Sequence, residues 1–246
     1  IYVTKLSAML ARNEQAMLPL FRKALFVILP LFTAACGGGN STSPMQDNEP
    51  VVVEIFEYMG EKLTSVTKLR DNSIQGPQAV NINSWRLKVD GLVDNPREFT
   101  YEELLARDTI KRLVWLHCVD GWSAKILWEG FSLARLFEEV GVQISARHAI
   151  FYAEDGYHNY LSVNYITVND IIVATHANGK PLSESRGFPL HVISQSKYGY
   201  KWCKWVTRIE LVKDGSQAGF YENRGYPREG NVGEHYYDPD ENRLRP

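Results

Sequence analysis

The sequence is poor in cysteine: Cys36, Cys118 and Cys203 are the three cysteines among 246 residues. An odd number disfavours a disulfide framework, so each cysteine needs its own explanation. The sequence also has no Cys-x-x-Cys pair and no His-x-x-x-His pair, which are common spacings of zinc ligands. Glycine-rich loops of the GxGxxG or Walker type are absent as well. These absences disfavour a small disulfide-stapled protein, a zinc protein and a nucleotide-binding fold.

The sequence also lacks a strong excess of positive or negative charge. The net charge is −2, both signs are interspersed, and no basic patch suits a nucleic-acid backbone. By contrast, 44% of the residues are hydrophobic and 12% are aromatic, which favours a sheet-rich core. The length fits one folded domain with additional segments, and we expect no nucleic-acid partner.

The first part of the chain reads as an export signal. Residues 17–36 combine Arg22 and Lys23 with an apolar run that is too short to span a bilayer, and they end in Thr-Ala-Ala-Cys. This pattern resembles a bacterial lipoprotein signal with Cys36 as the lipidated residue, although Thr33 stands where leucine is usual. The alternatives are an ordinary cleaved signal and a buried helix.

The flanks of this signal fit the same interpretation. Residues 1–16 precede a candidate start and are treated as an upstream extension, while residues 37–50 suit a flexible linker. We therefore expect an exported protein, lipid-anchored on the periplasmic or cell-surface side of a bacterial membrane. The signal lacks the Arg-Arg pair that is typical of proteins exported in the folded state.

The folded domain is expected over residues 51–225, followed by a polar tail over residues 226–246. Strands and short helices alternate without a strict βαβ rhythm, so the expected class is α+β with a mixed or antiparallel sheet. Thr100 and Glu103 predict a capping box. A helix is expected over residues 131–141. Strands are expected over residues 85–93, 112–118, 149–153, 190–194 and 202–212, and residues 51–58 form either a strand or the start of the domain.

Cys118 lies where the predicted strand 112–118 meets a loop containing Gly121. Loops held by a rigid sheet concentrate functional groups, and a thiolate is a strong ligand for transition metals. Considered alone, however, Cys118 is better explained as a buried core cysteine. His117 points to the other side of a strand, so the two residues do not form a nucleophilic pair. Cys203, in Trp-Cys-Lys-Trp, is interpreted as core packing.

A second candidate segment is Arg-Gly-Phe-Pro-Leu-His, residues 186–191, followed by Lys-Tyr-Gly-Tyr-Lys, residues 197–201. Gly199 allows close approach of the backbone to a ligand, and the flanking lysines suit a phosphate. By itself, however, a loop of this sequence is usually just a hairpin turn.

Taken in order, Cys-Val-Asp-Gly-Trp-Ser, Trp-Glu-Gly, the Asp155-Gly156-Tyr157 turn and these two segments resemble the molybdopterin-binding domain of the sulfite oxidase family. The similarity covers about residues 70–225 and is greatest to the small bacterial branch that includes the catalytic subunit of periplasmic methionine sulfoxide reductase. It implies a mixed-sheet fold with short peripheral helices and a molybdenum-molybdopterin cofactor. Cys118 matches the cysteine that ligates molybdenum.

The resemblance also implies cofactor contacts. Arg186 stands where relatives carry His or Asn, and His191 where they usually carry Arg, so both are departures from the pattern. The remaining implied contacts are a loose match near the metal, a turn and the phosphate loop: Asn72, Asp155, Tyr157, Tyr198, Gly199, Tyr200 and Lys201.

In this family the cofactor performs the redox chemistry, and the protein binds and tunes it. The resemblance implies two-electron oxo transfer on a small, sulfur-containing substrate, with sulfite disfavoured by His117 and His191. No Cys-x-x-Cys-His haem motif is present, so we expect a separate electron partner, a cytochrome or a quinone-linked protein. The sequence has no room for the large C-terminal dimerisation domain of full-length sulfite oxidases, so we expect a monomer. Two alternatives stay open: a lipid-anchored binding module that has lost the cofactor, and a cysteine hydrolase.

Overall fold

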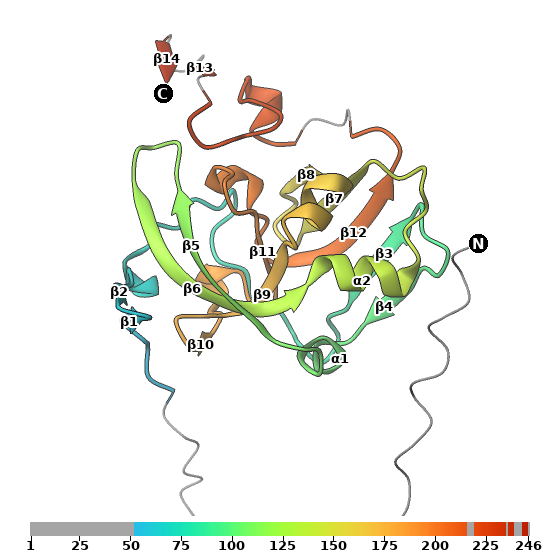
Figure 1. The fold of residues 1–246 in the computed structure, drawn as a ribbon, viewed down its shortest axis with the longest axis horizontal. Coiled ribbons are helices and arrows are strands. Elements are labelled where there is room, and N and C mark those ends of the chain that lie inside the picture. The colour runs from blue at the N-terminus through green and yellow to red at the C-terminus, as the bar shows by residue number, and fades with distance from the viewer. Residues whose placement is uncertain (1–51, 216–218, 235, 239–242, 246) are drawn as a thin grey trace, which may run out of the picture. The chain divides into compact units, whose positions relative to one another are not determined.

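The computed structural model describes residues 52–215, 219–234, 236–238 and 243–245. Two mixed or antiparallel sheets of five strands form most of it (Figure 1). In the first sheet the strand order is β10-β9-β6-β5, with β11 also paired to β9. Its strands are β5 (Ile110–His117), β6 (Ser123–Ser132), β9 (Ile172–Ala177), β10 (Lys180–Pro181) and β11 (His191–Ile193).

The second sheet has the order β4-β3-β12-β7-β8. Strand β12 is parallel to β3 and antiparallel to β7, which makes this sheet mixed. The expected fold class, α+β with a mixed sheet and short helices, is therefore confirmed. Its strands are β3 (Leu87–Gly91), β4 (Arg97–Phe99), β7 (His148–Ala153), β8 (His158–Ser162) and β12 (Val206–Val212).

Three short helices accompany the sheets: α1 (Tyr101–Leu105), α2 (Leu133–Val140) and α3 (Val163–Val168). The capping box predicted at Thr100 and Glu103 is present at the start of α1. Helix α2 ends at Val140 and is capped by Gly141, which adopts the left-handed conformation at φ 66° that glycine tolerates best. Two short pairs of strands lie outside the five-stranded sheets: β1 (Glu57–Tyr58) with β2 (Glu61–Lys62), and β13 (Tyr236–Asp238) with β14 (Arg243–Arg245).

Two sequence predictions need correction. The strand considered for residues 51–58 is reduced to β1, because Val52 and Val53 are exposed and bury no face against a neighbouring strand. The strand expected over residues 202–212 begins only at Val206, because Trp205 takes a left-handed φ of 51° that interrupts extended backbone. The first error comes from apolar residues that lack a partner strand, and the second from the backbone conformation of Trp205.

Two buried apolar clusters hold the sheets and helices. One gathers the second sheet with α1, α2 and α3 around residues such as Phe99, Leu136 and Phe151. The other surrounds β6 and β9 and contains Trp128 and Trp202. Among the described residues, no helix is long and apolar enough to cross a membrane.

Candidate functional site

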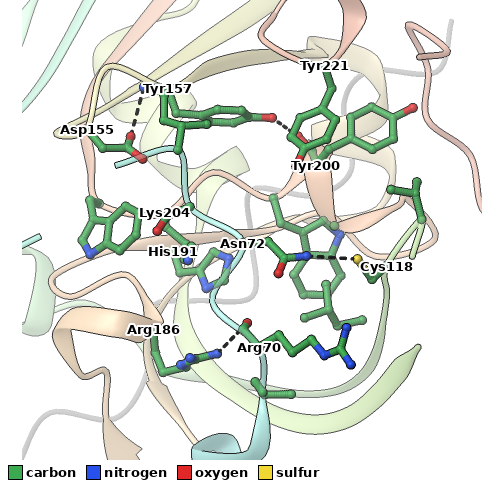
Figure 2. A pocket seen from close by; sticks show the side chains of 18 of the residues that line it. Arg70, Asn72, Cys118, Asp155, Tyr157, Arg186, His191, Tyr200, Lys204 and Tyr221 are labelled. Carbon is green, nitrogen blue, oxygen red and sulfur yellow. Dashed lines mark hydrogen bonds between the residues drawn. The ribbon is translucent and has the colours of Figure 1, made fainter. Parts of the chain in front are cut away.

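A pocket opens at the end of β5, where the first sheet meets the turn between β7 and β8. Figure 2 shows its lining residues converging from distant parts of the sequence. They come from residues 69–74, from β5, β6 and the turn between them, from the β7–β8 turn, from the stretch between Arg186 and Trp205, and from Tyr221. The site therefore depends on the whole fold rather than on one motif.

Cys118 is held at the pocket by the β5–β6 turn. Its backbone N–H donates to Trp122 O at 2.9 Å, and Gly121 N donates back to Cys118 O at 3.1 Å. Gly121 has φ of 87°, a conformation that a side chain disfavours. This tight turn presents the Cys118 side chain to the pocket, and the strand predicted to end at Cys118 ends one residue earlier.

Asn72 faces the thiol across the pocket (Figure 2). Its Nδ2 donates to Cys118 Sγ at 3.4 Å and to Asp120 Oδ2 at 3.2 Å. Burial raises the pKa of Cys118 to about 11, so the cofactor-free thiol is protonated at neutral pH. A bound transition metal deprotonates a thiol that coordinates it.

The backbone of Gly199 lies against the end of β5. Tyr198 and His117 form an isolated parallel bridge, and a Cβ on Gly199 would lie 3.3 Å from Leu116 Cδ1. Gly199 and Tyr200 thereby reach the pocket beside Cys118. The carbonyl of Tyr200 accepts hydrogen bonds from the Tyr157 hydroxyl and from Asn159 Nδ2.

Asp155 and Tyr157 line the pocket from the β7–β8 turn. Asp155 is buried, and its Oδ1 accepts from Tyr157 N at 3.0 Å. The carbonyl of Asp155 accepts from Gln75 Nε2 at 2.7 Å, which ties this turn to the segment that carries Asn72.

Arg186 and Lys204 lie at another part of the pocket, away from Cys118 in Figure 2, whereas the side chain of Arg70 extends toward the Cys118 side of this view. Arg186 Nη1 donates to Arg70 O at 3.3 Å, and Lys204 Nζ lies 2.6 Å from Asp71 Oδ1. Burial lowers the pKa of both side chains, while Asp71 opposes the shift in each. An Arg and a Lys that share one carboxylate leave positive charge for an anionic group.

His191 is buried beside these cations. Burial lowers its pKa to about 3, and the charges of Lys204 and Arg186 act in the same direction, so the imidazole is neutral. Its ring packs edge-on against Trp128 and Trp202, at 5.1 and 6.2 Å between centroids. The positive charge in this part of the pocket therefore comes from Arg186 and Lys204, and not from His191.

Three buried polar atoms of the pocket wall have no hydrogen-bond partner within the described part of the chain. They are His191 Nδ1, Trp122 Nε1 and Trp128 Nε1. Buried polar atoms are normally satisfied, so unpaired ones that surround a pocket indicate a polar ligand. Together with the thiol and the two cations, they suit a molecule with a metal, a polar heterocycle and an anionic group.

Most of the predicted site residues line this pocket: Asn72, Cys118, Asp155, Tyr157, Arg186, His191, Gly199 and Tyr200. Tyr198 and Lys201 are not among its lining residues. Tyr198 donates its backbone N–H to Gly230 O, and Lys201 pairs with Glu222 in the protein interior. The phosphate role predicted for Lys201 is thus unsupported by its position. Cys36 lies outside the described residues.

Sequence reasoning missed Lys204 and Tyr221, which both line the pocket. Lys204 was within the motif Lys-Tyr-Gly-Tyr-Lys-Trp-Cys-Lys-Trp, but spacing alone did not indicate which lysine faces inward. Cys203, interpreted as core packing, is fully buried in the larger apolar cluster.

Comparisons with known proteins agree with this geometry. Residues 74–221 match the family model of the oxidoreductase molybdopterin-binding domain. The uncharacterised oxidoreductase YuiH of Bacillus subtilis is 32% identical over 155 residues, which are 63% of this chain and 78% of YuiH. A candidate protein-methionine-sulfoxide reductase subunit, YedZ1 of Azospira oryzae, is 28% identical over 60% of this chain and 56% of its own.

A solved structure shares the fold. The sulfane dehydrogenase SoxCD from Paracoccus pantotrophus aligns with a TM-score of 0.57 and 20% sequence identity, over 69% of this chain and 46% of its own. This structural match, the family match over residues 74–221 and the identity with YuiH agree with one another. The chain belongs to the oxidoreductase molybdopterin-binding domain family, the sulfite oxidase family of molybdenum-dependent oxidoreductases.

Proposed function

We propose that this protein transfers an oxygen atom, with two electrons, to or from a small sulfur-containing substrate, using a molybdenum-molybdopterin cofactor in the Cys118 pocket. The observation that carries the proposal is the pocket itself. It joins a thiol to unpaired buried donors and to two cations, in a chain of this family.

Each part of the pocket has a role in this proposal. Cys118 would supply the protein thiolate to molybdenum, with Asn72 orienting it. Arg186 and Lys204 would bind the anionic phosphate, and the unpaired atoms of His191 and Trp128 would meet the pterin. The cofactor supplies the two-electron redox chemistry when bound. The protein positions it and surrounds it with aromatic side chains.

The carboxylate and the aromatic side chains beside Cys118 favour a neutral sulfur substrate over sulfite, although Arg70 also lines this pocket. Asp120 is linked to Cys118 through Asn72 Nδ2, so a carboxylate stands close to the thiol. Trp122 and Tyr221 add aromatic surface to the same pocket. A carboxylate repels an anion, whereas aromatic faces suit a neutral sulfoxide or thioether. The names of YedZ1 and SoxCD also refer to sulfur compounds.

We further propose that electrons pass to or from a separate protein, a cytochrome or a quinone-linked protein. The sequence has no Cys-x-x-Cys-His haem motif, and YedZ1 is itself named as a subunit. A lipid anchor at Cys36 would hold the enzyme at the outer side of a bacterial membrane, where such partners are available.

Metal and pterin analysis, followed by a substrate screen, tests the proposal. The protein is purified from a cofactor-competent host and assayed with sulfite and with several S- and N-oxides, using dye electron carriers. We expect close to one molybdenum per chain and activity on neutral S-oxides. Less than about a tenth of an equivalent of metal would instead support a binding module without cofactor.

A further inference from the structure

Lys201 is fully buried although lysine is among the residues that rarely are. Its Nζ lies 2.6 Å from Glu222 Oε1 and donates to Arg228 O at 2.8 Å. It also lies 4.0 Å from the centre of the Tyr160 ring. The Glu222 side chain is as buried as that of Lys201, with exposed fractions of 0% and 1%. The two residues form an ion pair that is shielded from water.

Glu222 belongs to residues 219–233, which we call the clasp. The clasp contacts residues 196–204, which we call the pocket loop, at several further points. They include the hydrogen bonds from Tyr198 N to Gly230 O at 2.8 Å, from Tyr200 Oη to Pro227 O at 2.7 Å, and from Lys197 Nζ to Asn231 Oδ1 at 2.8 Å. The buried pair is the most desolvated of these contacts.

The pocket loop and the clasp both form part of the pocket wall. The pocket loop contributes Gly199, Tyr200 and Lys204, and the clasp contributes Tyr221, the neighbour of Glu222. The rings of Tyr221 and Tyr200 stack at 5.4 Å between centroids, with an interplanar angle of 29°. The placement of Tyr221 therefore depends on how firmly the clasp holds the pocket loop.

We propose that Lys201 and Glu222 are positioning residues: their buried pair fixes the clasp on the pocket loop and so retains the cofactor, without touching it. The proposal rests on the proposed function for the identity of the cofactor. The phosphate-binding lysine of the pocket is then Lys204, and Lys201 acts only through Tyr200 and Tyr221.

The physics of buried ion pairs makes this testable. Removing one partner leaves an uncompensated buried charge, which is strongly destabilising, whereas replacing both by apolar residues of similar volume is often neutral. Lys201→Met should therefore loosen the clasp, and the double variant Lys201→Met/Glu222→Leu should close it again. A lysine that binds phosphate directly is not rescued by a change at Glu222.

The experiment compares the full-length wild type, Lys201→Met, the double variant and Lys204→Met, all produced in a cofactor-competent host. Molybdenum and pterin per chain are measured after dialysis, with the melting temperature of each protein. We expect Lys201→Met to lose most of its cofactor and to melt at a lower temperature. The double variant should recover both properties, and Lys204→Met should lose cofactor but melt like the cofactor-free wild type.

Trypsin cleavage after Arg228 supplies a readout that needs no cofactor. It should be accelerated in Lys201→Met and return to the wild-type rate in the double variant. If the double variant melts like the wild type but lacks cofactor, Lys201 binds the cofactor directly and the proposal is wrong. A wild type without molybdenum would contradict the proposed function instead, while the trypsin result still decides whether the pair fixes the clasp.

A second variant covers the case in which the double variant does not fold. Glu222→Gln keeps Lys201 but removes its counter-charge. The proposal expects this variant to lose cofactor and to be cleaved faster after Arg228. Wild-type cofactor content and wild-type cleavage in Glu222→Gln would overturn it.

Discussion

Cys118 owes its chemical character to its immediate neighbours. The amide of Asn72 and the carboxylate of Asp120 lie close to its sulfur, and burial raises its pKa to about 11. A nucleophilic cysteine needs the opposite environment, one that lowers the pKa. The adjacent His117 does not provide it, since its Nδ1 is hydrogen-bonded to Ser123 Oγ at 2.7 Å. These contacts favour a metal ligand over a hydrolase nucleophile.

The rate of alkylation by iodoacetamide measures this difference. In the cofactor-free protein, Cys118 should react slowly at neutral pH, because only the thiolate reacts and the raised pKa keeps the thiol protonated. The rate should then rise roughly tenfold per pH unit towards pH 11. Mass mapping of the labelled peptide assigns the rate to Cys118, with Cys203→Ala as the control. Fast labelling that is flat above neutral pH would favour the cysteine hydrolase.

For individual residues, the sequence predicted which segments form the site but not every side chain that enters it. Cys118, Asn72 and Gly199 were predicted because strand ends, turns and family motifs fix their backbone positions. Lys201 and Lys204 are three residues apart, and a 3-10 turn over Gly199–Lys201 decides which one faces the pocket. Local spacing does not reveal this choice, because Glu222, the partner of Lys201, is distant in sequence.

Strands β6 and β9 pack so closely that there is no space for a side chain at Gly130. Their register shifts between Glu129 and Gly130, and a Cβ on Gly130 would lie 2.0 Å from Val173 O and 2.6 Å from Ala174 Cα. These are backbone atoms, so a side chain at Gly130 would have to displace strand β9. Strand β9 also pairs with β11, which carries His191.

Gly130→Ala should therefore lower the free energy of unfolding by more than about 2 kcal/mol. Gly60→Ala is the matched control, because its added Cβ meets nothing within 4 Å and only its left-handed φ of 78° is penalised. That penalty is about 1 kcal/mol. Denaturant unfolding followed by circular dichroism measures both, and equal losses would show that the contact with β9 is unimportant.

Elements with local signals were predicted well. The α2 helix was expected over residues 131–141 and spans Leu133–Val140, because β6 continues to Ser132, which then caps the helix through Arg135 N. Pairing and backbone conformation set the remaining limits: β12 starts late, at Val206, because Trp205 has a left-handed φ, and β1 is short because the residues before it lack a partner strand. Such limits depend on tertiary contacts that periodicity does not contain.

For the whole molecule, the family match covers residues 74–221, and the clasp extends the organised region beyond it. The signal and linker predicted for residues 17–50 lie outside the described residues, so the anchor stays a prediction from sequence. Cys36 tests it directly, since that thiol is the proposed attachment point.

Cys36→Ala should move the protein from the membrane fraction to the soluble fraction of an expressing bacterium, and palmitate labelling should disappear. A single acyl chain attaches a protein to a membrane only weakly and reversibly, whereas two or more chains on one cysteine anchor it stably. We therefore expect stable attachment of the wild type. Thr33→Ala, a change beside the cleavage site that keeps Cys36, is the control. Unaltered membrane association of Cys36→Ala would refute the lipid anchor.

If Cys118 ligates molybdenum, its replacement by alanine will change the visible absorption spectrum of the protein. The variant is compared with Cys203→Ala, in which the fully buried core thiol is removed instead. We predict that Cys203→Ala keeps the visible thiolate-to-molybdenum absorption, and that Cys118→Ala stays folded but loses both this absorption and redox activity. A Cys118→Ala protein that keeps the wild-type spectrum and full activity would contradict the account.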